Sequence, residues 1–110
     1  MKYIELDNTL PNQKFSFKTD TATVEITLRT VDGIMLMSVD SNGENIISNI
    51  KVASNVPLLC YDYLQQRFGD FMFTTTDEQY PIYTNFNNAN KLYWLSYDEV
   101  KKYKESLLNG

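Results

Sequence analysis

The chain of 110 residues contains no histidine and a single cysteine, Cys60. Without histidine the chain lacks the commonest general base, the commonest zinc ligand and every nucleophilic triad that depends on an imidazole. One cysteine cannot form an internal disulfide, so the fold does not rely on an oxidising compartment. We interpret Cys60 as a small apolar core residue beside Leu58 and Leu59, and not as a reactive thiol.

Long apolar runs and an excess of basic residues are also missing. No run approaches the roughly 18 residues of a membrane span, and the first residues lack the apolar core of a signal peptide. The formal net charge is −4, with 14 acidic and 10 basic residues, whereas proteins that bind a nucleic-acid backbone need clustered Lys and Arg. We therefore expect a protein made and folded in a cytoplasm, with neither nucleic acid as primary ligand nor a membrane as partner.

The composition that remains is globular and rich in aromatic residues. Hydrophobic residues make up 43% of the chain and aromatic residues 14%, which is not the composition of a disordered protein. The length fits one core. No repeat or linker interrupts the sequence, so we predict a single domain over residues 1–110.

Alternation of apolar and polar residues predicts short strands joined by tight turns. The clearest strand is expected at residues 23–31, followed by a hairpin turn at Asp32-Gly33. Residues 34–39 are apolar on both faces, which is typical of a strand that is buried on both sides or meets a partner on one. A second hairpin turn is expected at residues 40–43. Further strands are expected at residues 3–6, 14–18, 45–52, 70–75 and 92–95.

Two segments need a separate prediction. In the strand that ends at Val52, alternation places Ile46 and Ile50 on the same face as Val52 and places Ile47 on the opposite face. Residues 61–66 fit either a helical turn or a strand, and the sequence leaves both open.

The hydrophobic period changes after residue 95. Ser96 and Glu99 have the spacing of a capping box, which predicts a helix over about residues 97–108. With strands confined to about residues 3–95, the expected fold class is mainly β: a single small antiparallel β-barrel or sandwich with a short C-terminal helix. The helix is expected to bury a narrow apolar stripe of Val100, Tyr103 and Leu107.

Carboxylates offer the main alternative to histidine chemistry. A glycosidase or a metal site would need two of them held together in a cleft. The candidates are Asp62, Asp70 and the adjacent Asp77 and Glu78, which we interpret as solvated loop acids. Residues 40–44 lack the later glutamate of a calcium loop, so a turn explains them better. We expect no catalytic, metal-binding or cofactor-binding residue.

The aromatic side chains divide between core and surface. Core packing is the simplest role for Phe15, Phe17, Phe71, Phe73 and Trp94. Tyrosine combines a large contact area with a polar tip, so exposed tyrosines can anchor an interface. Core and partner-contact roles stay equally open for Tyr80, Tyr83, Tyr93 and Tyr97.

Motifs spread over most of the chain resemble a known family when they are taken in order and with their spacing. These motifs are Pro11-Asn12-Gln13 before a Phe-rich strand, Leu28-Arg29-Thr30 leading into a hairpin, Ile50 and Val52, Leu58-Leu59 before Tyr61, Tyr63 and Leu64, Phe68-Gly69, Asp77 with Pro81, and the closing strand 91–95. Over roughly residues 3–95 the chain resembles the small baseplate plug proteins of contractile-tailed bacteriophages. It departs from that pattern at Ile34-Met35-Leu36 and at Asn55-Val56-Pro57.

The resemblance implies a structural virion protein. Plug proteins of this kind sit at the baseplate hub and occlude the tail channel near the spike, without catalysis or cofactor. The implied partners are the baseplate hub, tail tube or spike proteins of the same phage, and association with further copies in the assembled tail stays open. The implied location is the virion tail baseplate, after synthesis in the host bacterial cytoplasm. Asn12 and Gln13 are candidates for a docking turn.

Two other functions compete with this one. The first alternative is a small β-barrel module that binds a peptide or an oligosaccharide. The second is a small acid-dependent hydrolase. Replacement of Asp62, Asp70 or Asp77 by alanine is expected to be silent unless the protein is a hydrolase.

Overall fold

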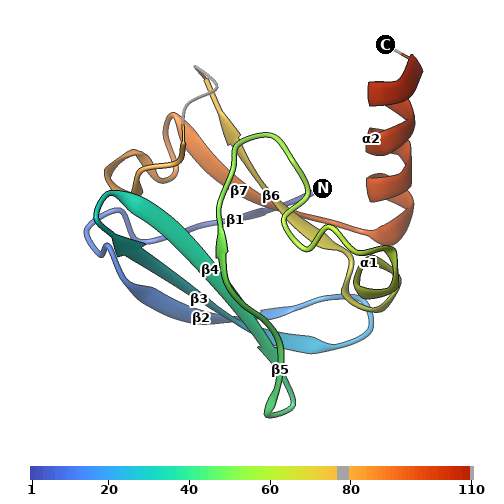
Figure 1. Cartoon of the computed structure of the whole chain (residues 1–110), viewed down its shortest axis with the longest axis horizontal. Coiled ribbons are helices and arrows are strands. Elements are labelled where there is room, and N and C mark those ends of the chain that lie inside the picture. Colours follow the sequence, from blue (N-terminus) through green and yellow to red (C-terminus); the bar gives the residue numbers. More distant parts are fainter. Residues whose placement is uncertain (77–79, 110) are drawn as a thin grey trace.

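The computed structural model describes residues 1–76 and 80–109. In these residues the chain forms seven strands, two α-helices and one 3-10 turn (Figure 1). The strands are β1 Lys2–Ile4, β2 Gln13–Lys18, β3 Thr23–Val31, β4 Ile34–Ser41, β5 Glu44–Lys51, β6 Asp70–Thr75 and β7 Asn90–Leu95. The helices are α1 Asp62–Phe68 and α2 Tyr97–Asn109, and the 3-10 turn η1 is Tyr83–Asn85.

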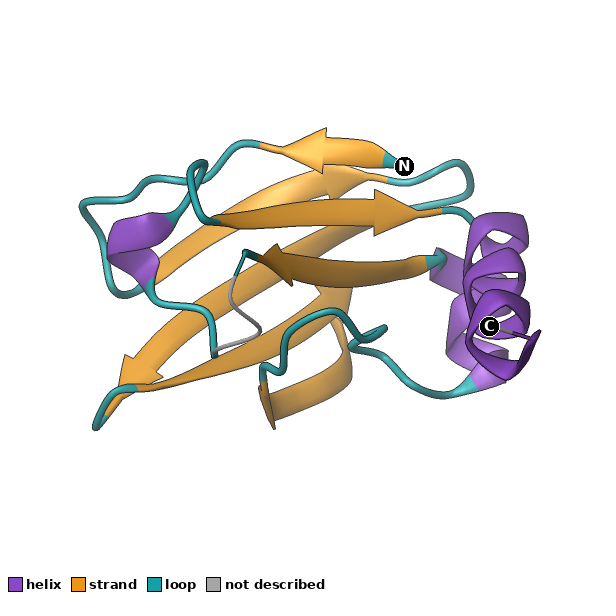
Figure 2. Cartoon of the chain, turned by 90° about the horizontal axis from the view of Figure 1, so that it is seen from above, coloured by secondary structure: helices purple, strands orange, loops and turns teal. Residues whose placement is uncertain are grey.

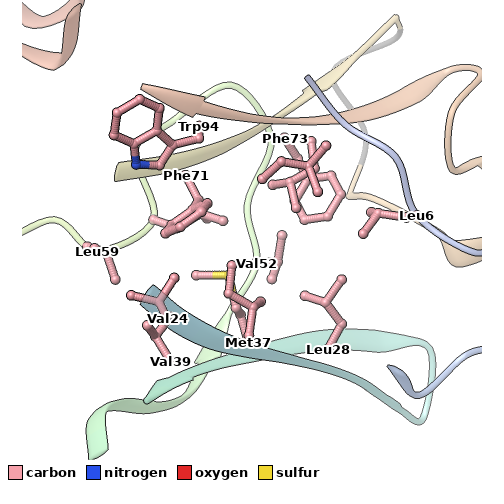
Figure 3. Close-up of a cluster of buried hydrophobic side chains, with 14 of the residues drawn as sticks. Leu6, Val24, Leu28, Met37, Val39, Val52, Leu59, Phe71, Phe73 and Trp94 are labelled. Carbon is pink, nitrogen blue, oxygen red and sulfur yellow. The ribbon is translucent and has the colours of Figure 1, made fainter. Parts of the chain in front are cut away.

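The strands form two antiparallel sheets that share one core. One sheet has the order β2-β3-β4-β5 and the other the order β1-β7-β6. Figure 3 shows the side chains of the two sheets meeting between them, with Phe71, Phe73 and Trp94 on one side and Val24, Leu28, Met37 and Val39 on the other. Among the described residues no strand pairing joins the sheets into a closed barrel, so the predicted mainly β class is confirmed without the barrel.

The long β3–β4 hairpin follows its sequence pattern closely. β3 has the predicted bounds, with its alternate apolar residues buried. Asp32 and Gly33 have φ values of 51° and 79°, which is the left-handed geometry of a two-residue hairpin turn. The second turn is shorter than predicted, because β4 continues to Ser41 and only Asn42 and Gly43 form the turn.

The alternation predicted for β5 is wrong. Two register shifts separate its pairs with β4, and Asn49 has a positive φ of 48°. Each extra residue of a bulge reverses the face to which the next side chains point. As a result Ile46, Ile47 and Ile50 all pack against the same core, although Ile47 was expected on the opposite face.

The outer face of β4 is not covered by the described parts of the chain. Ile34 is 44% exposed and Leu36 is half-buried, so this strand is not buried on both sides. The other alternative, that one face of this strand meets a partner, stays a prediction.

The two helices lie together at one end of the sheets, as Figures 1 and 2 show. The open choice at residues 61–66 is resolved as helix, and the capping box of α2 is formed: the Glu99 N–H donates to Ser96 Oγ and the Ser96 N–H donates to Glu99 Oε1. Val100 is buried in a small second cluster with Met72 and Leu95.

The expected apolar stripe of α2 ends early. Val100 is buried and Tyr103 is half-buried, but Leu107 is 62% exposed. The last turn of α2 therefore buries little of its apolar surface. Among the described residues no helix is both long and apolar enough to cross a membrane.

Candidate interaction surface

The four tyrosines for which core and partner-contact roles were open differ in exposure and in contacts. Tyr80 is 60% exposed, and Lys51 Nζ lies 4.4 Å from the centre of its ring. Tyr83 is half-buried and packs against the main core. Tyr80 is therefore available for contact, whereas the ring of Tyr83 is largely used inside the fold.

The other two tyrosines lie near α2. Tyr93 is half-buried on the outer face of β7, with its ring 5.7 Å from that of Tyr3. Tyr97 begins α2, and its hydroxyl donates to Asp62 Oδ1 over 3.0 Å, which joins α2 to α1. Both tyrosines thus hold elements of this chain together.

Asn12 and Gln13 are engaged within the chain as well. Asn12 Oδ1 accepts the Thr30 N–H over 3.0 Å. Gln13 Nε2 donates to the carbonyl oxygens of Asp7 and Leu10, over 2.9 and 3.1 Å, and Gln13 Oε1 accepts the Asp7 N–H. These bonds fold the loop before β2 and give both amides a structural role.

An apolar groove lies beside the edge strand β5. It has a volume of about 230 Å³. One wall is β5, and the other is the segment of residues 53–61, which runs towards α1 (Figure 1). The groove is lined by Ile47, Ile50, Lys51, Ala53, Val56, Pro57, Leu58, Leu59, Cys60 and Tyr61.

Only an indirect signal for this groove exists in the sequence. Pro57 blocks a regular strand in residues 53–61, and the segment instead covers the edge of β6. The Asn55 N–H donates to the Phe73 carbonyl oxygen over 2.6 Å, and the Leu58 N–H donates to that of Phe71 over 2.9 Å. This wall is therefore tied to a core strand.

A buried carboxylate fixes the same wall from beneath. Asp70 Oδ1 accepts the N–H groups of Leu59 and Phe71, over 2.8 and 2.6 Å. Asp70 Oδ2 accepts Gln65 Nε2 over 2.7 Å, and Gln65 Oε1 accepts Lys104 Nζ over 2.6 Å. These bonds connect residues 58–59, α1, β6 and α2.

The interpretation of Asp70 as a solvated loop acid is wrong. Its side chain is fully buried, and burial raises its pKa above the ordinary value, against the hydrogen bonds from Leu59 and Gln65 that lower it. No regular spacing marks this role, because the donors Leu59, Gln65 and Phe71 lie 11, 5 and 1 residues from Asp70. By contrast, Asp62 is exposed as expected.

Cys60 also differs from its prediction. It is exposed at the groove instead of buried in the core. Leu58 and Leu59 are both buried, and Cys60 follows them with a φ of 68°, so the backbone turns and its side chain leaves the core. Partial burial and the nearby Asp70 charge raise the pKa of the thiol.

The described residues hold no group of three or more His, Cys, Asp or Glu side chains arranged for a metal ion. Asp77 and Glu78, the remaining acidic candidates, lie outside the described residues. The groove beside β5 is thus an apolar surface whose wall is held by hydrogen bonds.

Comparison with known protein families gives a match, whereas no curated protein matches the chain. The matching family is described as cyanophage baseplate Pam3 plug gp18, and the match covers residues 1–98. It includes all seven strands and ends in the first turn of α2. The chain therefore belongs to the cyanophage baseplate plug family, a family of structural proteins of the bacteriophage tail baseplate.

Proposed function

We propose that this protein is a plug that occludes the tail channel at the baseplate hub, near the spike, until contraction. The observation that carries the proposal is the family match over residues 1–98. In this function the protein acts as a single domain, by contact alone, without catalysis and without a cofactor. Its partners are the hub, tail tube or spike proteins of the same phage.

The fold suits a passive element that has to resist deformation. We interpret the two stacked sheets as a β-sandwich, in which interdigitated side chains form a close-packed interior. Phe71 and Phe73 are fully buried between the sheets. Contact with neighbours would use the exposed apolar side chains, which include Val56 at 41% exposure and Tyr61 at 56%.

A deletion of the gene in its phage tests the proposal. Particles that lack the protein are expected to show an empty channel at the hub by cryo-electron microscopy, and to lose their DNA early. Complementation with the wild-type gene should restore both features. Particles without the protein that keep a filled channel and full DNA retention would contradict the proposal.

A peptide-binding module is the second candidate. The groove beside β5 favours a peptide over an oligosaccharide, because its lining is mostly apolar and offers few of the polar groups that fix a sugar. Such a module would bind its peptide as a free protein and would be missing from complete virions. A hydrolase that uses Asp70 is disfavoured, because both oxygens of this carboxylate are occupied in supporting the fold.

A further inference from the structure

We propose that the groove beside β5 receives a short extended segment of a neighbouring baseplate protein. This segment seats one large apolar side chain between β5 and residues 56–61, and carries a carboxylate next to it that meets Lys51. The inference deepens the proposed function, and rests on it, by naming the docking site and the chemistry of the segment that fills it.

The size and walls of the groove suit a side chain more than a small molecule. Its volume of about 230 Å³ is below the roughly 300–1,000 Å³ of typical small-molecule sites. Ile47 and Ile50 face it from β5, and Val56 and Tyr61 face it from the other wall. Burial of an apolar group there would also remove Val56 and Tyr61 from water, which is favourable in proportion to the area covered.

The charge of the lining indicates the second feature of the segment. Among the described residues that line the groove, Lys51 alone is charged, and there is no acid. The Lys51 ammonium lies over the ring of Tyr80, and it forms no ion pair with any carboxylate of the described residues. A carboxylate at the Lys51 end of the groove would therefore meet a cation, while the Asp70 charge lies behind the opposite wall, near Cys60. Such charge complementarity sets specificity at interfaces.

The backbone of β5 limits how long the segment can be. β5 is an edge strand, and such a strand can pair with an added one. Its register shifts lie between Asn45 and Ile50, so beside the groove only Ile50 and Lys51 follow each other in regular register. The contact therefore depends on a short segment and its side-chain anchor, and not on a long added strand.

The opposite wall is already in place before anything binds. The bonds from Asn55, Leu58 and Leu59 to β6 and Asp70 fix its backbone, and the Tyr103 hydroxyl donates to the Asn55 carbonyl oxygen. A preformed site avoids the cost of ordering a loop on binding. The support around Asp70 thus acts through the groove wall, as a positioning element.

A matched pair of valine substitutions tests this site in the phage. Val56→Glu places a carboxylate at the groove, and Val31→Glu makes the same change at a valine of nearly equal exposure, 43% against 41%, that does not line it. Each variant is supplied from a plasmid to the deletion phage, and its amount in purified virions is measured by mass spectrometry. We expect Val56→Glu to reduce incorporation at least tenfold and Val31→Glu to leave it within about twofold.

Lys51→Glu tests the charge, and it is expected to reduce incorporation by a smaller factor of roughly threefold to tenfold. Thermal unfolding of the purified variants separates misfolding from lost docking. Wild-type incorporation of a folded Val56→Glu protein would overturn the inference, and so would an equal loss with Val31→Glu. Absence of the wild-type protein from virions would instead contradict the proposed function.

The single cysteine provides an independent measurement on unmodified particles. Cys60 lies at the groove and is exposed in the free chain. Its alkylation by iodoacetamide should be at least tenfold slower in intact virions than in the purified protein, and equal once the virions are dissociated in urea. Equal rates in both folded forms would overturn the inference. A purified protein that dimerises, and that Val56→Glu makes monomeric, would also overturn it by identifying a second copy as the occupant.

Discussion

The core-facing side of β6 and its first residue, Asp70, are held in place by different kinds of interaction. Towards the core, Phe71 and Phe73 pack among apolar side chains of both sheets. At the helical end, Asp70 gathers hydrogen bonds from Leu59, Phe71 and Gln65. Apolar packing is weakly directional and depends on area, whereas a buried carboxylate requires each donor in its place. Apolar packing holds the two sheets together, and the hydrogen bonds to Asp70 set the position of the groove wall.

The largest expected effect comes from Gly69, which connects α1 to β6. Its φ of 73° and ψ of −151° fall in a region that only glycine adopts readily. A Cβ there would lie 2.3 Å from the Leu95 carbonyl oxygen and 2.7 Å from Trp94 Nε1. Gly69→Ala should lower the free energy of unfolding by about 5 kcal/mol or leave the protein unfolded.

Gly33→Ala is the matched control, because Gly33 also has a positive φ but a Cβ added there would meet no atom within 4 Å. It should cost only about 1 kcal/mol. Urea unfolding followed by tryptophan fluorescence measures both variants. Similar losses from the two substitutions would show that the close approach at Gly69 is not important.

The next largest effect separates Asp70 from Asp62. Asp70→Ala leaves the N–H groups of Leu59 and Phe71 and the Gln65 amide without their acceptor, and should cost about 3 kcal/mol. Asp62→Ala removes an exposed carboxylate and should scarcely move the urea midpoint. Equal midpoints for the two variants would contradict the role given to the buried carboxylate. The expectation that alanine substitutions are silent stays a prediction for Asp62 and for Asp77, which lies outside the described residues.

The same two residues predict opposite responses to pH. Burial raises the folded-state pKa of Asp70 above its ordinary value of 3.8, so its contribution to stability is complete below that value and is lost as pH rises through the folded-state pKa. Hydrogen bonds from Gln66 and Tyr97 lower the pKa of Asp62, so its contribution is present above its ordinary value and is lost on acidification.

Unfolding free energies of wild type, Asp70→Asn and Asp62→Asn at about pH 2.5, pH 4 and pH 7 check these signs, because the Asp62 contribution is lost only below about pH 4. Relative to wild type, Asp70→Asn should gain stability as the pH rises, and Asp62→Asn should gain stability as the pH falls. Parallel profiles for the two variants would contradict the assignment.

The smallest effect concerns α2, where the hydrogen bonds are local. Ser96→Ala removes the hydroxyl that accepts the Glu99 N–H and should cost about 1 kcal/mol. Ser106→Ala alters an exposed serine inside the same helix and should change little. Hydrogen exchange of the α2 amides should accelerate in the first variant only. Unchanged exchange in Ser96→Ala would show that the capping box does not hold the helix.

The sequence predicted the parts of the fold that depend on period and turn chemistry. The bounds of β3 and β6 were correct. β3 alternates between a buried and a more exposed face, and β6 carries the buried Phe71 and Phe73. The capping box marked the start of α2 in the same way. The two β5 bulges could not be predicted from alternation, since a bulge changes the alternation itself.

The candidate site was harder to predict than the fold. The groove depends on a long-range arrangement in which residues 53–61 cover β6 while leaving a hollow beside β5. Cys60 and Asp70 were both misjudged for that reason: the exposure of one and the burial of the other follow from tertiary contacts that no local spacing reveals. The functional class came from the family resemblance, which the match over residues 1–98 confirms.

The most direct measurement is quantitative mass spectrometry of purified, infectious virions of the phage that carries this gene. We predict peptides from residues 31–51 at a few copies per particle, at a constant ratio to the hub and spike proteins. These peptides should stay with the tail fraction when heads and tails are separated. Complete infectious particles without this protein would contradict its role as a baseplate plug.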